Sequence, residues 1–200
     1  MTGRGAFVAF EGGEASGKST QAARLASRRG AVLTREPGGT QLGERVRDLF
    51  LDHDTGDVDA RAEVLLVAAA RAQHVAEVIE PALFAGRDVV TDRFTGSSLA
   101  YQGYGRQLDV ADVAAVSAFA TGGVEPDVYV LLDVTAEVAA ARLGKDRDRL
   151  ESAGDDFHER VRGGYREIAG RDGWIVIDGS DAPDAVEAAV WEAVSGRLGW

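Results

Sequence analysis

Five short apolar segments recur along the chain, and each is followed by a longer segment whose apolar residues repeat with helical spacing. The short segments are rich in Val, Ile, Leu and Phe, and most are apolar at successive positions rather than at alternate ones. That pattern is typical of strands buried on both faces of a parallel sheet. We expect the strands at residues 6–10, 31–34, 88–91, 127–133 and 174–178.

The longer segments predict seven helices. The longest is expected to begin at Ala60 and to end near Pro81, because proline interrupts the hydrogen bonding of a helix interior. Thr135 is expected to cap another helix, with Glu137 in its first turn. The helices are expected from the glycine-rich loop at 12–17 to about Arg29 and at residues 41–51, 60–80, 109–120, 135–143, 156–169 and 183–198.

The alternation of strands and helices indicates βαβ units. The predicted fold class is therefore α/β, with a doubly wound, five-stranded parallel sheet. The sequence has no internal repeat and no low-complexity linker, and 200 residues are enough for one well-buried core. We expect a single domain over residues 1–200.

Composition and charge exclude several classes of function. The chain has no cysteine, which excludes disulfides and thiolate zinc sites, and its net charge is −11. An acidic chain lacks the basic footprint of a general nucleic-acid binder. No apolar run is long enough to span a bilayer, and the first strand starts too early for a signal peptide. We expect a cytoplasmic protein without nucleic-acid or membrane partners.

The stretch from Gly12 to Thr20, GGEASGKST, lies between the first predicted strand and a predicted helix. It fits the pattern G-x-x-x-x-G-K-[ST], in which backbone N–H groups and a helix N-terminus hold phosphate oxygens. Lys18 can contact the β- and γ-phosphates, and the hydroxyl of Ser19 can ligate Mg²⁺, so we predict binding of a nucleoside triphosphate. The residues expected to bind it are Gly12, Gly13, Glu14, Ala15, Ser16, Gly17, Lys18, Ser19 and Thr20.

Three classes of protein combine such a loop with an α/β fold. A regulatory GTPase needs a guanine-recognition motif, and the nearest string, GKDRD at 144–148, lacks its Asn or Thr. A motor or translocase is usually longer and carries a basic track for its polymer. A small-molecule kinase fits the length best, and it needs an acceptor pocket and a lid that excludes water.

Two further strings, TREPGGT at 34–40 and TDRFTGSSLAYQG at 91–103, follow the second and third strands, so they are expected to face the phosphate loop. With FEGGEASGKST, AEVLLVAAARAQ and RLGKDRDRLE, they closely resemble the thymidylate kinases from about Phe7 to Asp178. The resemblance implies a P-loop nucleoside monophosphate kinase fold with a short lid at about 142–153. It also implies that a homodimer transfers the γ-phosphate of ATP to dTMP, with Mg²⁺.

The resemblance assigns the metal and the acceptor phosphate. Asp92 would organise Mg²⁺ together with Ser19, and Arg93 would hold the phosphate of dTMP. Glu14 would lie near the acceptor 3′-hydroxyl, and Arg35 with its EPGG turn would form an acceptor-side loop. From the residues alone, Asp92 is also consistent with a helix cap or a surface turn, Arg93 with a structural salt bridge, and Glu14 with a solvent-exposed side chain.

The same resemblance assigns the contacts to the base and the sugar. Arg71 on the long helix would face a thymine carbonyl, and Tyr101 would crowd the 2′ position of the sugar and so favour deoxyribose. Ser97, Ser98 and Gln102 would supply hydroxyl and amide groups near the base. A solvated helix face is the alternative for Arg71, and a buried core tyrosine is the alternative for Tyr101.

Phosphoryl transfer needs cationic groups that neutralise developing charge. Some thymidylate kinases carry an arginine inside the phosphate loop, but here that position is Ala15. The chain instead places Arg142, Lys145, Arg147 and Arg149 in the predicted lid, where Arg142 in the family's scheme packs near adenine. A solvated, charge-mixed helix end is the alternative for this cluster. The expected catalytic residues are Lys18, Asp92, Arg93, Arg147 and Arg149.

Two features depart from the family. Val67 stands where the family usually carries a phenylalanine that stacks on thymine, and Phe94 and Tyr104 are the candidates to compensate. Only about a dozen residues separate Thr20 from Thr34, so we expect a shortened first helix. Two alternatives stay open: a kinase for another deoxynucleoside monophosphate, and a regulatory protein that hydrolyses ATP or GTP without transferring phosphate.

Overall fold

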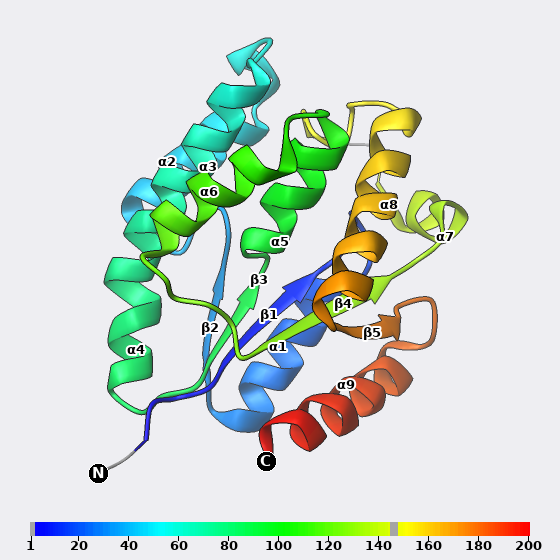
Figure 1. Cartoon of the computed structure of the whole chain (residues 1–200). Coiled ribbons are helices and arrows are strands. Elements are labelled where there is room, and N and C mark those ends of the chain that lie inside the picture. The colour runs from blue at the N-terminus through cyan, green and yellow to red at the C-terminus, as the bar shows by residue number, and fades with distance from the viewer. Residues whose placement is uncertain (1–2, 145–147) are drawn as a thin grey trace.

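The computed structural model describes residues 3–144 and 148–200. Within these residues a five-stranded sheet has the strand order β2-β3-β1-β4-β5, and all its pairings are parallel (Figure 1). The predicted α/β class and parallel sheet are confirmed, and each strand begins one residue later than expected. The strands are β1 (Phe7–Glu11), β2 (Val32–Arg35), β3 (Val89–Asp92), β4 (Val128–Asp133) and β5 (Ile175–Asp178).

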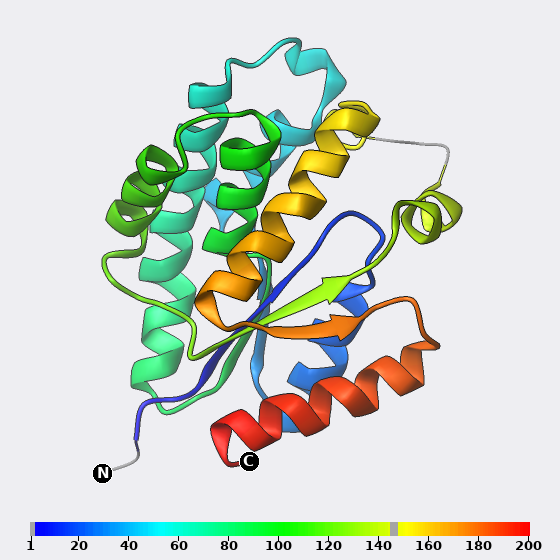
Figure 2. The same cartoon turned by 45° about the vertical axis from the view of Figure 1, so that its right-hand side comes forward.

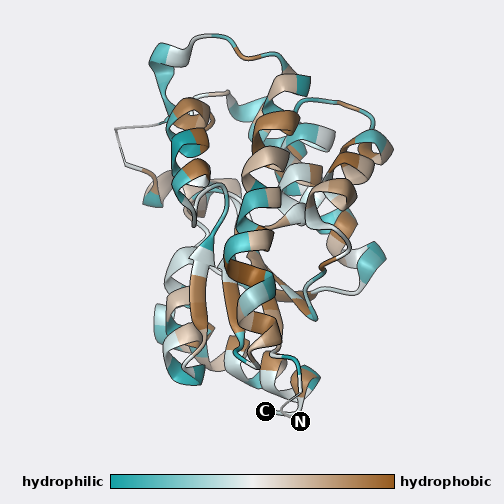
Figure 3. Ribbon diagram, turned by 90° about the vertical axis from the view of Figure 1, so that its left-hand side faces the viewer, coloured by the Kyte–Doolittle hydropathy of each residue, from teal (hydrophilic) through white to brown (hydrophobic). Residues whose placement is uncertain are grey.

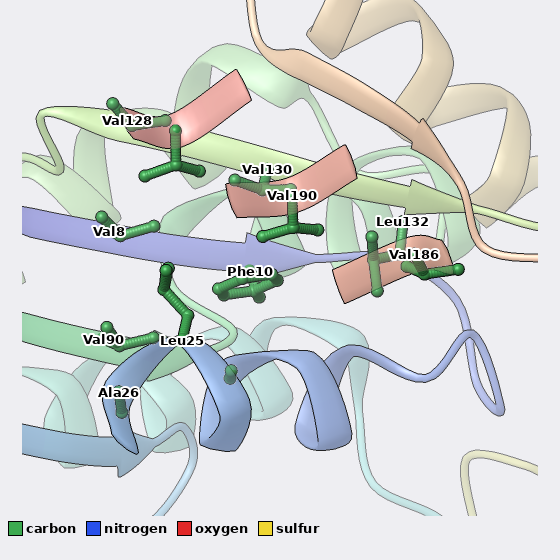
Figure 4. Packing of buried hydrophobic residues seen from close by; sticks show 12 residues of the cluster. Val8, Phe10, Leu25, Ala26, Val90, Val128, Val130, Leu132, Val186 and Val190 are labelled. Atoms are coloured by element: carbon green, nitrogen blue, oxygen red, sulfur yellow. The ribbon is translucent and has the colours of Figure 1, made fainter. Parts of the chain in front are cut away.

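One face of the sheet is covered by α1 (Lys18–Arg29) and α9 (Pro183–Leu198). Val8 and Phe10 of β1 point to this face, and they pack with Leu25 and with valines of α9 (Figure 4). These side chains are buried from water. Full burial of one such side chain contributes about 1.5–3 kcal/mol to stability, so this cluster holds the two helices on the sheet.

The opposite face is covered by α8 and by helices from the middle of the chain (Figure 2). Phe7 and Ala9 point to this side and pack with Ile79 and Leu83, while Leu131 joins a second cluster with α8. In Figure 3 the visible strands are brown, the colour of hydrophobic residues, over much of their length and paler at an arrow end. The helices here are α2 (Gln41–Leu51), α3 (Ala60–His74), η2 (Val75–Ile79), α4 (Glu80–Phe84), α5 (Thr95–Ser98), η3 (Leu99–Gly105), α6 (Val110–Thr121) and α8 (Asp155–Asp172), and the short η1 (His53–Thr55) and α7 (Ala136–Arg142) lie in connections.

Most of the predicted helices have nearly the expected bounds. Those predicted at 41–51 and 183–198 coincide with α2 and α9, and the first helix ends at Arg29. Thr135 caps α7 as expected, because its hydroxyl accepts a hydrogen bond from the N–H of Val138 at 3.3 Å. No helix among the described residues is long and apolar enough to cross a membrane.

The predicted end of the long helix near Pro81 is wrong. The π-helical turn η2 follows His74, and α4 then continues the helical path to Phe84 with Pro81 in its first turn. Proline lacks an N–H group, and it enters the helical path directly after the π turn, where the N–H of Glu80 bonds to the carbonyl oxygen of Val75 instead of that of residue 76. The hydrogen-bond register changes at the π turn, and residue spacing does not reveal such a change.

The segment from Thr95 to Gly105 is helical, although the hydrophobic pattern does not predict it. It consists of α5 and the π-helical η3 and contains Gly96, Gly103 and Gly105. Glycine costs a helix about 1 kcal/mol relative to alanine, so packing overrides a weak local preference here. At Gly105 the packing is close, because a Cβ atom would lie 2.7 Å from Cε2 of Phe157 in α8.

Candidate active site

The phosphate loop joins β1 to α1 through residues with unusual backbone angles. Gly12 and Ala15 have φ of +148° and +54°. At Gly12 a side chain is excluded, because a Cβ atom would lie 2.6 Å from the carbonyl oxygen of Leu132. Lys18 starts α1, is 5% exposed, and donates from Nζ to the carbonyl oxygen of Gly13 at 2.9 Å. The loop therefore encloses one buried ammonium group.

Ser19 and Asp92 form the corner of the site that fits Mg²⁺. The hydroxyl of Ser19 donates to Oδ2 of Asp92, and Oδ1 of Asp92 is buried without a hydrogen-bond partner among the described residues. The pairing of β1 with β3 places Asp92 beside Phe10, just before the loop. Mg²⁺ prefers oxygen ligands, and it typically takes one or two from the protein and the rest from phosphates and water. The predicted metal ligands are thus brought together.

Arg35 lies on the metal side of the site. Its side chain is half-exposed and forms an ion pair with Glu44 at 2.9 Å. It borders a hollow together with Ser19 and Asp92, and not the cavity that contains Arg71. Arg35 is therefore not among the described residues that line the cavity with Arg71, and its contact with the acceptor stays a prediction.

Arg93 follows β3 and connects the phosphate loop to a neighbouring cavity. Its Nη1 donates to the carbonyl oxygen of Gly12 at 3.0 Å, and its Nη2 donates to Oε1 of Glu14 at 2.6 Å. On the cavity side it donates to the hydroxyls of Ser97 and Tyr101, both at 3.2 Å. Its backbone φ is +73°, a conformation that non-glycine residues seldom adopt and that clusters at functional sites.

Glu14 points into the site rather than into solvent. Its Oε1 also accepts a hydrogen bond from the hydroxyl of Tyr101 at 2.6 Å, and its Oε2 lies 4.0 Å from Nζ of Lys18. Burial would raise the pKa of this carboxyl, but the charges of Arg93 and Lys18 and the hydrogen bond from Tyr101 lower it to about 2. Glu14 is therefore ionised at neutral pH and balances the cations beside the loop.

The cavity beside Arg93 lies between α2, α3 and the helical segment that follows β3. Tyr101 and Gln102 are both buried, and both line this cavity. Tyr101 is therefore a buried tyrosine, as the alternative reading expected, and also a residue of the site. Gln102 also donates to Oε2 of Glu63 at 3.4 Å. The predicted base and sugar contacts are therefore brought together here. They are Arg71, Ser97, Ser98, Tyr101 and Gln102.

Arg71 is 1% exposed, so the alternative of a solvated helix face is wrong. Its Nε donates to Oε2 of Glu36 at 2.7 Å. Its Nη2 donates to the carbonyl oxygen of Phe94 and to the hydroxyl of Ser98, both at 3.0 Å, and its Nη1 donates to the hydroxyl of Ser117 at 3.3 Å. These contacts hold the guanidinium group in one orientation at the cavity wall.

Glu36 supports Arg71 from the turn after β2. Its carboxyl is buried, and its Oε1 lies 3.0 Å from Nδ1 of His74. The other ring nitrogen of His74 lies 2.6 Å from the hydroxyl of Thr34. The buried positive charge of Arg71 is thus paired with a carboxylate that is itself hydrogen-bonded, as a buried ion pair requires.

Arg47 is a cavity residue that the sequence does not single out. It lies on α2, lines the same cavity as Arg93, and donates to the carbonyl oxygen of Pro37 at 3.1 Å. Burial and the positive charge of Arg35 lower its pKa. The guanidinium groups of Arg47, Arg71 and Arg93 line this one cavity, which favours an anionic ligand. Helical spacing does not distinguish Arg47 from the exposed Arg45, because the packing of α2 decides which of them faces the site.

Glu11 and Tyr165 are further site residues that sequence reasoning missed. Glu11 ends β1 and is fully buried, and it accepts hydrogen bonds from the N–H of Phe94 at 3.0 Å and the hydroxyl of Ser97 at 2.6 Å. Burial raises its pKa. The hydroxyl of Tyr165 accepts from Nη1 of Arg93 at 3.0 Å. The sequence did contain a signal for Glu11, because it directly follows an apolar strand. A carboxyl that is buried at a strand end needs polar partners, and such partners indicate a site.

Arg142, at the end of α7, makes its contacts with backbone groups. It donates to the carbonyl oxygens of Gly179 at 2.8 Å and Ser180 at 3.2 Å, in the connection between β5 and α9. Its Nη1 also lies 3.5 Å from the carbonyl oxygen of Ala15 in the phosphate loop. Arg142 therefore links the connection between β5 and α9 to the phosphate loop, beside the predicted binding site for the nucleoside triphosphate.

Glu63 is a fully buried carboxyl on α3 that is paired with two arginines. Its Oε1 lies 2.7 Å from Nη1 of Arg149 and 2.9 Å from Nη2 of Arg106. Arg149 also donates from Nε to the carbonyl oxygen of Phe50 at 3.0 Å. In this arrangement Arg149 anchors the end of the predicted lid to α2 and α3. The other expected lid catalyst, Arg147, lies outside the described residues, as does Lys145.

Sequence comparison decides the family. A family model described as thymidylate kinase matches residues 10–190, which is most of the chain. This chain belongs to the thymidylate kinase family. The resemblance expected from the sequence motifs is confirmed, and so is the fold class that this resemblance implies.

Named thymidylate kinases match the chain over nearly its full length. One from Solidesulfovibrio magneticus is 48% identical over 208 residues, covering 96% of this chain and 99% of its own length. One from Leifsonia xyli subsp. xyli is 45% identical over 203 residues and covers 97% and 96%. The crystal structure of thymidylate kinase from Ehrlichia chaffeensis superposes with a TM-score of 0.77 at 32% identity, covering 96% of this chain and 99% of that one.

Proposed function

We propose that this chain transfers the γ-phosphate of ATP to dTMP and so produces dTDP and ADP. The observation that carries the proposal is the position of Arg93. It contacts the phosphate loop through Gly12 and Glu14, and it contacts the cavity through Ser97 and Tyr101. A guanidinium group fixed between two nucleotide sites is suited to hold an acceptor phosphate beside the donor, and positioning is a large part of catalysis in phosphoryl transfer.

On the donor side, the loop backbone and the ammonium group of Lys18 would bind the phosphates of ATP. Ser19 and Asp92 would hold Mg²⁺, which neutralises charge on the β- and γ-phosphates when it is bound. The buried Oδ1 of Asp92, which has no partner among the described residues, supports this metal site. Arg142 would pack near adenine, since it lies beside the loop.

On the acceptor side, Arg93 and Arg47 would bind the phosphate of dTMP, because both line the cavity. Arg71 would donate to a thymine carbonyl, with Ser98 and Gln102 close to the base. The guanidinium group of Arg71 is already oriented by four hydrogen bonds among the described residues, so little ordering is needed when the base binds.

The sugar of dTMP would lie against Tyr101 and Glu14, on the cavity side of the hydrogen bond that joins them. Tyr101 is oriented by its hydrogen bond to Glu14, so its ring is fixed at the cavity wall, where it would exclude a 2′-hydroxyl group. The ionised carboxylate of Glu14 can accept a hydrogen bond from the 3′-hydroxyl. Ser97, hydrogen-bonded to Glu11 and Arg93, completes this side of the pocket.

Charge neutralisation during transfer is assigned to the lid. Arg147 would contribute a guanidinium group to the transferred phosphate, as expected from Ala15 in the loop. A direct catalytic role for Arg149 stays a prediction. Its ion pair with Glu63 supports a positioning role, in which it anchors the lid two residues after Arg147.

We also propose that two copies of the chain form a homodimer. Helices α2, α3 and α6 lie side by side (Figure 1), and they carry exposed large apolar side chains. These are Leu42, Leu49, Leu65 and Phe119. We expect a mass in solution of twice the 21.1 kDa of one chain, measured by light scattering, and dissociation in Leu65→Glu. A wild-type protein with the mass of one chain would contradict this proposal.

An acceptor panel tests the proposed reaction. ADP formation is measured with ATP, Mg²⁺ and either dTMP, dUMP, dCMP or dGMP, and we expect the highest kcat/KM with dTMP. Removal of Mg²⁺ by EDTA should stop the reaction, because the metal carries much of the charge neutralisation. Another acceptor as good as dTMP would favour the alternative kinase. ATP hydrolysis at the same rate with and without an acceptor would favour a regulatory protein.

A cytoplasmic location stays a prediction.

A further inference from the structure

We propose that Phe50 of α2 provides the aromatic surface against which the acceptor base packs. This inference rests on the proposed function, because it names a specificity-determining residue of that same cavity. Phe50 and Val67 both line the cavity together with Arg71. The resemblance to the family leads us to expect an aromatic ring at position 67 on α3. In this chain the ring comes from α2 instead.

The place of the base follows from the spacing of Val67 and Arg71. The two residues are four apart in α3, so their side chains share one face of the helix. A planar base held at its carbonyl by Arg71 therefore lies along the part of the cavity wall that Val67 occupies. Val67 offers an aliphatic contact there but no π surface. Phe50 belongs to the same buried cluster as Val67 and reaches the same cavity.

Phe94 and Tyr104 are the aromatic residues expected from the sequence to compensate for Val67. Phe94 lines the same cavity, but it is fully buried and its ring is held by other contacts. The ring of Phe94 is packed edge-on by Phe7, with centroids 5.1 Å apart, and the guanidinium carbon of Arg71 lies 5.3 Å from its centroid. Tyr104 donates its hydroxyl hydrogen to Glu167 of α8 at 2.6 Å, and it is not among the described residues that line the cavity. Phe50 is the better candidate for base stacking.

Phe50 is also held in place by Arg149, the residue that anchors the predicted lid to α2 and α3. Its carbonyl oxygen accepts the hydrogen bond from Arg149, whose guanidinium group lies over the ring at 5.5 Å from the centroid. Arg149 is in turn fixed by the buried carboxyl of Glu63. A ring that is already immobilised loses little freedom when a base packs against it, which favours binding. Tyr101 is held by its hydrogen bond to Glu14 near the phosphate loop, so its ring belongs to the phosphate end of the cavity and not to the base end.

A double-mutant cycle on the full chain tests this inference. Calorimetry measures the Kd of dTMP and of ATP for the wild type, Phe50→Leu, Val67→Phe and the double variant. Phe50→Leu should weaken dTMP binding by about 10-fold, as expected for the loss of one base–aromatic stack. Val67→Phe should also weaken it, because a second ring overfills the cavity. The double variant has one ring again and should regain most of the affinity, and ATP binding should stay unchanged.

Phe157→Leu is the matched control, because Phe157 lies in the same cluster with the same 3% exposure but is not among the described residues that line the cavity. It should lower the melting temperature and leave the Kd of dTMP unchanged. Unchanged dTMP affinity in Phe50→Leu, or tighter binding in Val67→Phe, would overturn the inference. If Phe50→Leu does not fold, the change in the Kd of dTMP caused by Val67→Phe still tests the inference: weaker binding supports it and tighter binding contradicts it. Wild-type protein that binds ATP but not dTMP would overturn the proposed function itself.

Discussion

Replacing Lys18 by alanine is expected to lower kcat for dTMP phosphorylation by about 10³-fold, the cost of removing one fixed donor from a developing negative charge. Lys18 is buried in the phosphate loop and is held by the carbonyl oxygen of Gly13. Water cannot replace a buried ammonium group that is already oriented, because solvent dipoles must reorganise while charge moves. The measurement is steady-state ADP formation with dTMP at saturating ATP, together with the far-ultraviolet circular dichroism spectrum of the variant.

Two companion variants separate the charge of Lys18 from its volume. Lys18→Met keeps most of the side-chain volume but no charge, so it should lose activity as Lys18→Ala does. Arg28→Ala removes a positive charge from the exposed end of the same helix and should keep the wild-type rate. A folded Lys18→Met variant with the kcat of the wild type would contradict the role of the ammonium group.

Glu63→Gln is expected to lower the free energy of unfolding by about 3–5 kcal/mol, because it leaves buried positive charge without its partner. Glu63 is fully buried, and the side chains of Arg149 and Arg106 that pair with it are 12% and 26% exposed. A neutral amide of the same shape keeps the packing, so the change isolates the charge. Urea denaturation of the wild type and the variant, fitted with a common m-value, measures the difference.

Glu159→Gln is the control for this prediction. Glu159 also pairs with an arginine, Arg162, but its side chain is 68% exposed on α8. Exposed ion pairs contribute about 1 kcal/mol or less, so this variant should unfold almost as the wild type does. Equal losses in Glu63→Gln and Glu159→Gln would mean that the arginines at Glu63 are solvated and that the lid anchor has no energetic importance.

The strands and the phosphate loop could be predicted because their signals are local. A run of apolar residues in consecutive positions needs cover on both faces, whatever helix later supplies that cover. The loop is equally local, since Gly12, Gly17, Lys18 and Ser19 lie within nine consecutive residues between a strand and a helix. Family motifs extended this prediction to Arg71, Arg93 and the residues around Tyr101.

The helical path through Pro81 and the helix at residues 95–105 could not be predicted from local sequence signals. Both contain π-helical turns, and the second is rich in glycine. Local propensity disfavours such segments. In the folded chain, Ile79 and Leu83 of the first segment pack on Phe7 of the sheet, and α8 packs on the second segment. The sequence therefore predicted the sheet better than the helical layer above the site.

Local spacing determined which residues of this chain lie on strands, on helix faces and in the loop that holds phosphates. Tertiary structure alone decided that Arg47 and not Arg45 lines the cavity, and that Arg149 meets Glu63. It also decided that Phe50 shares a wall with Val67. Helical periodicity states which side chains share a face. The neighbour of that face depends on how α2 packs against α3 and the lid, and those contacts join segments that are far apart in the chain.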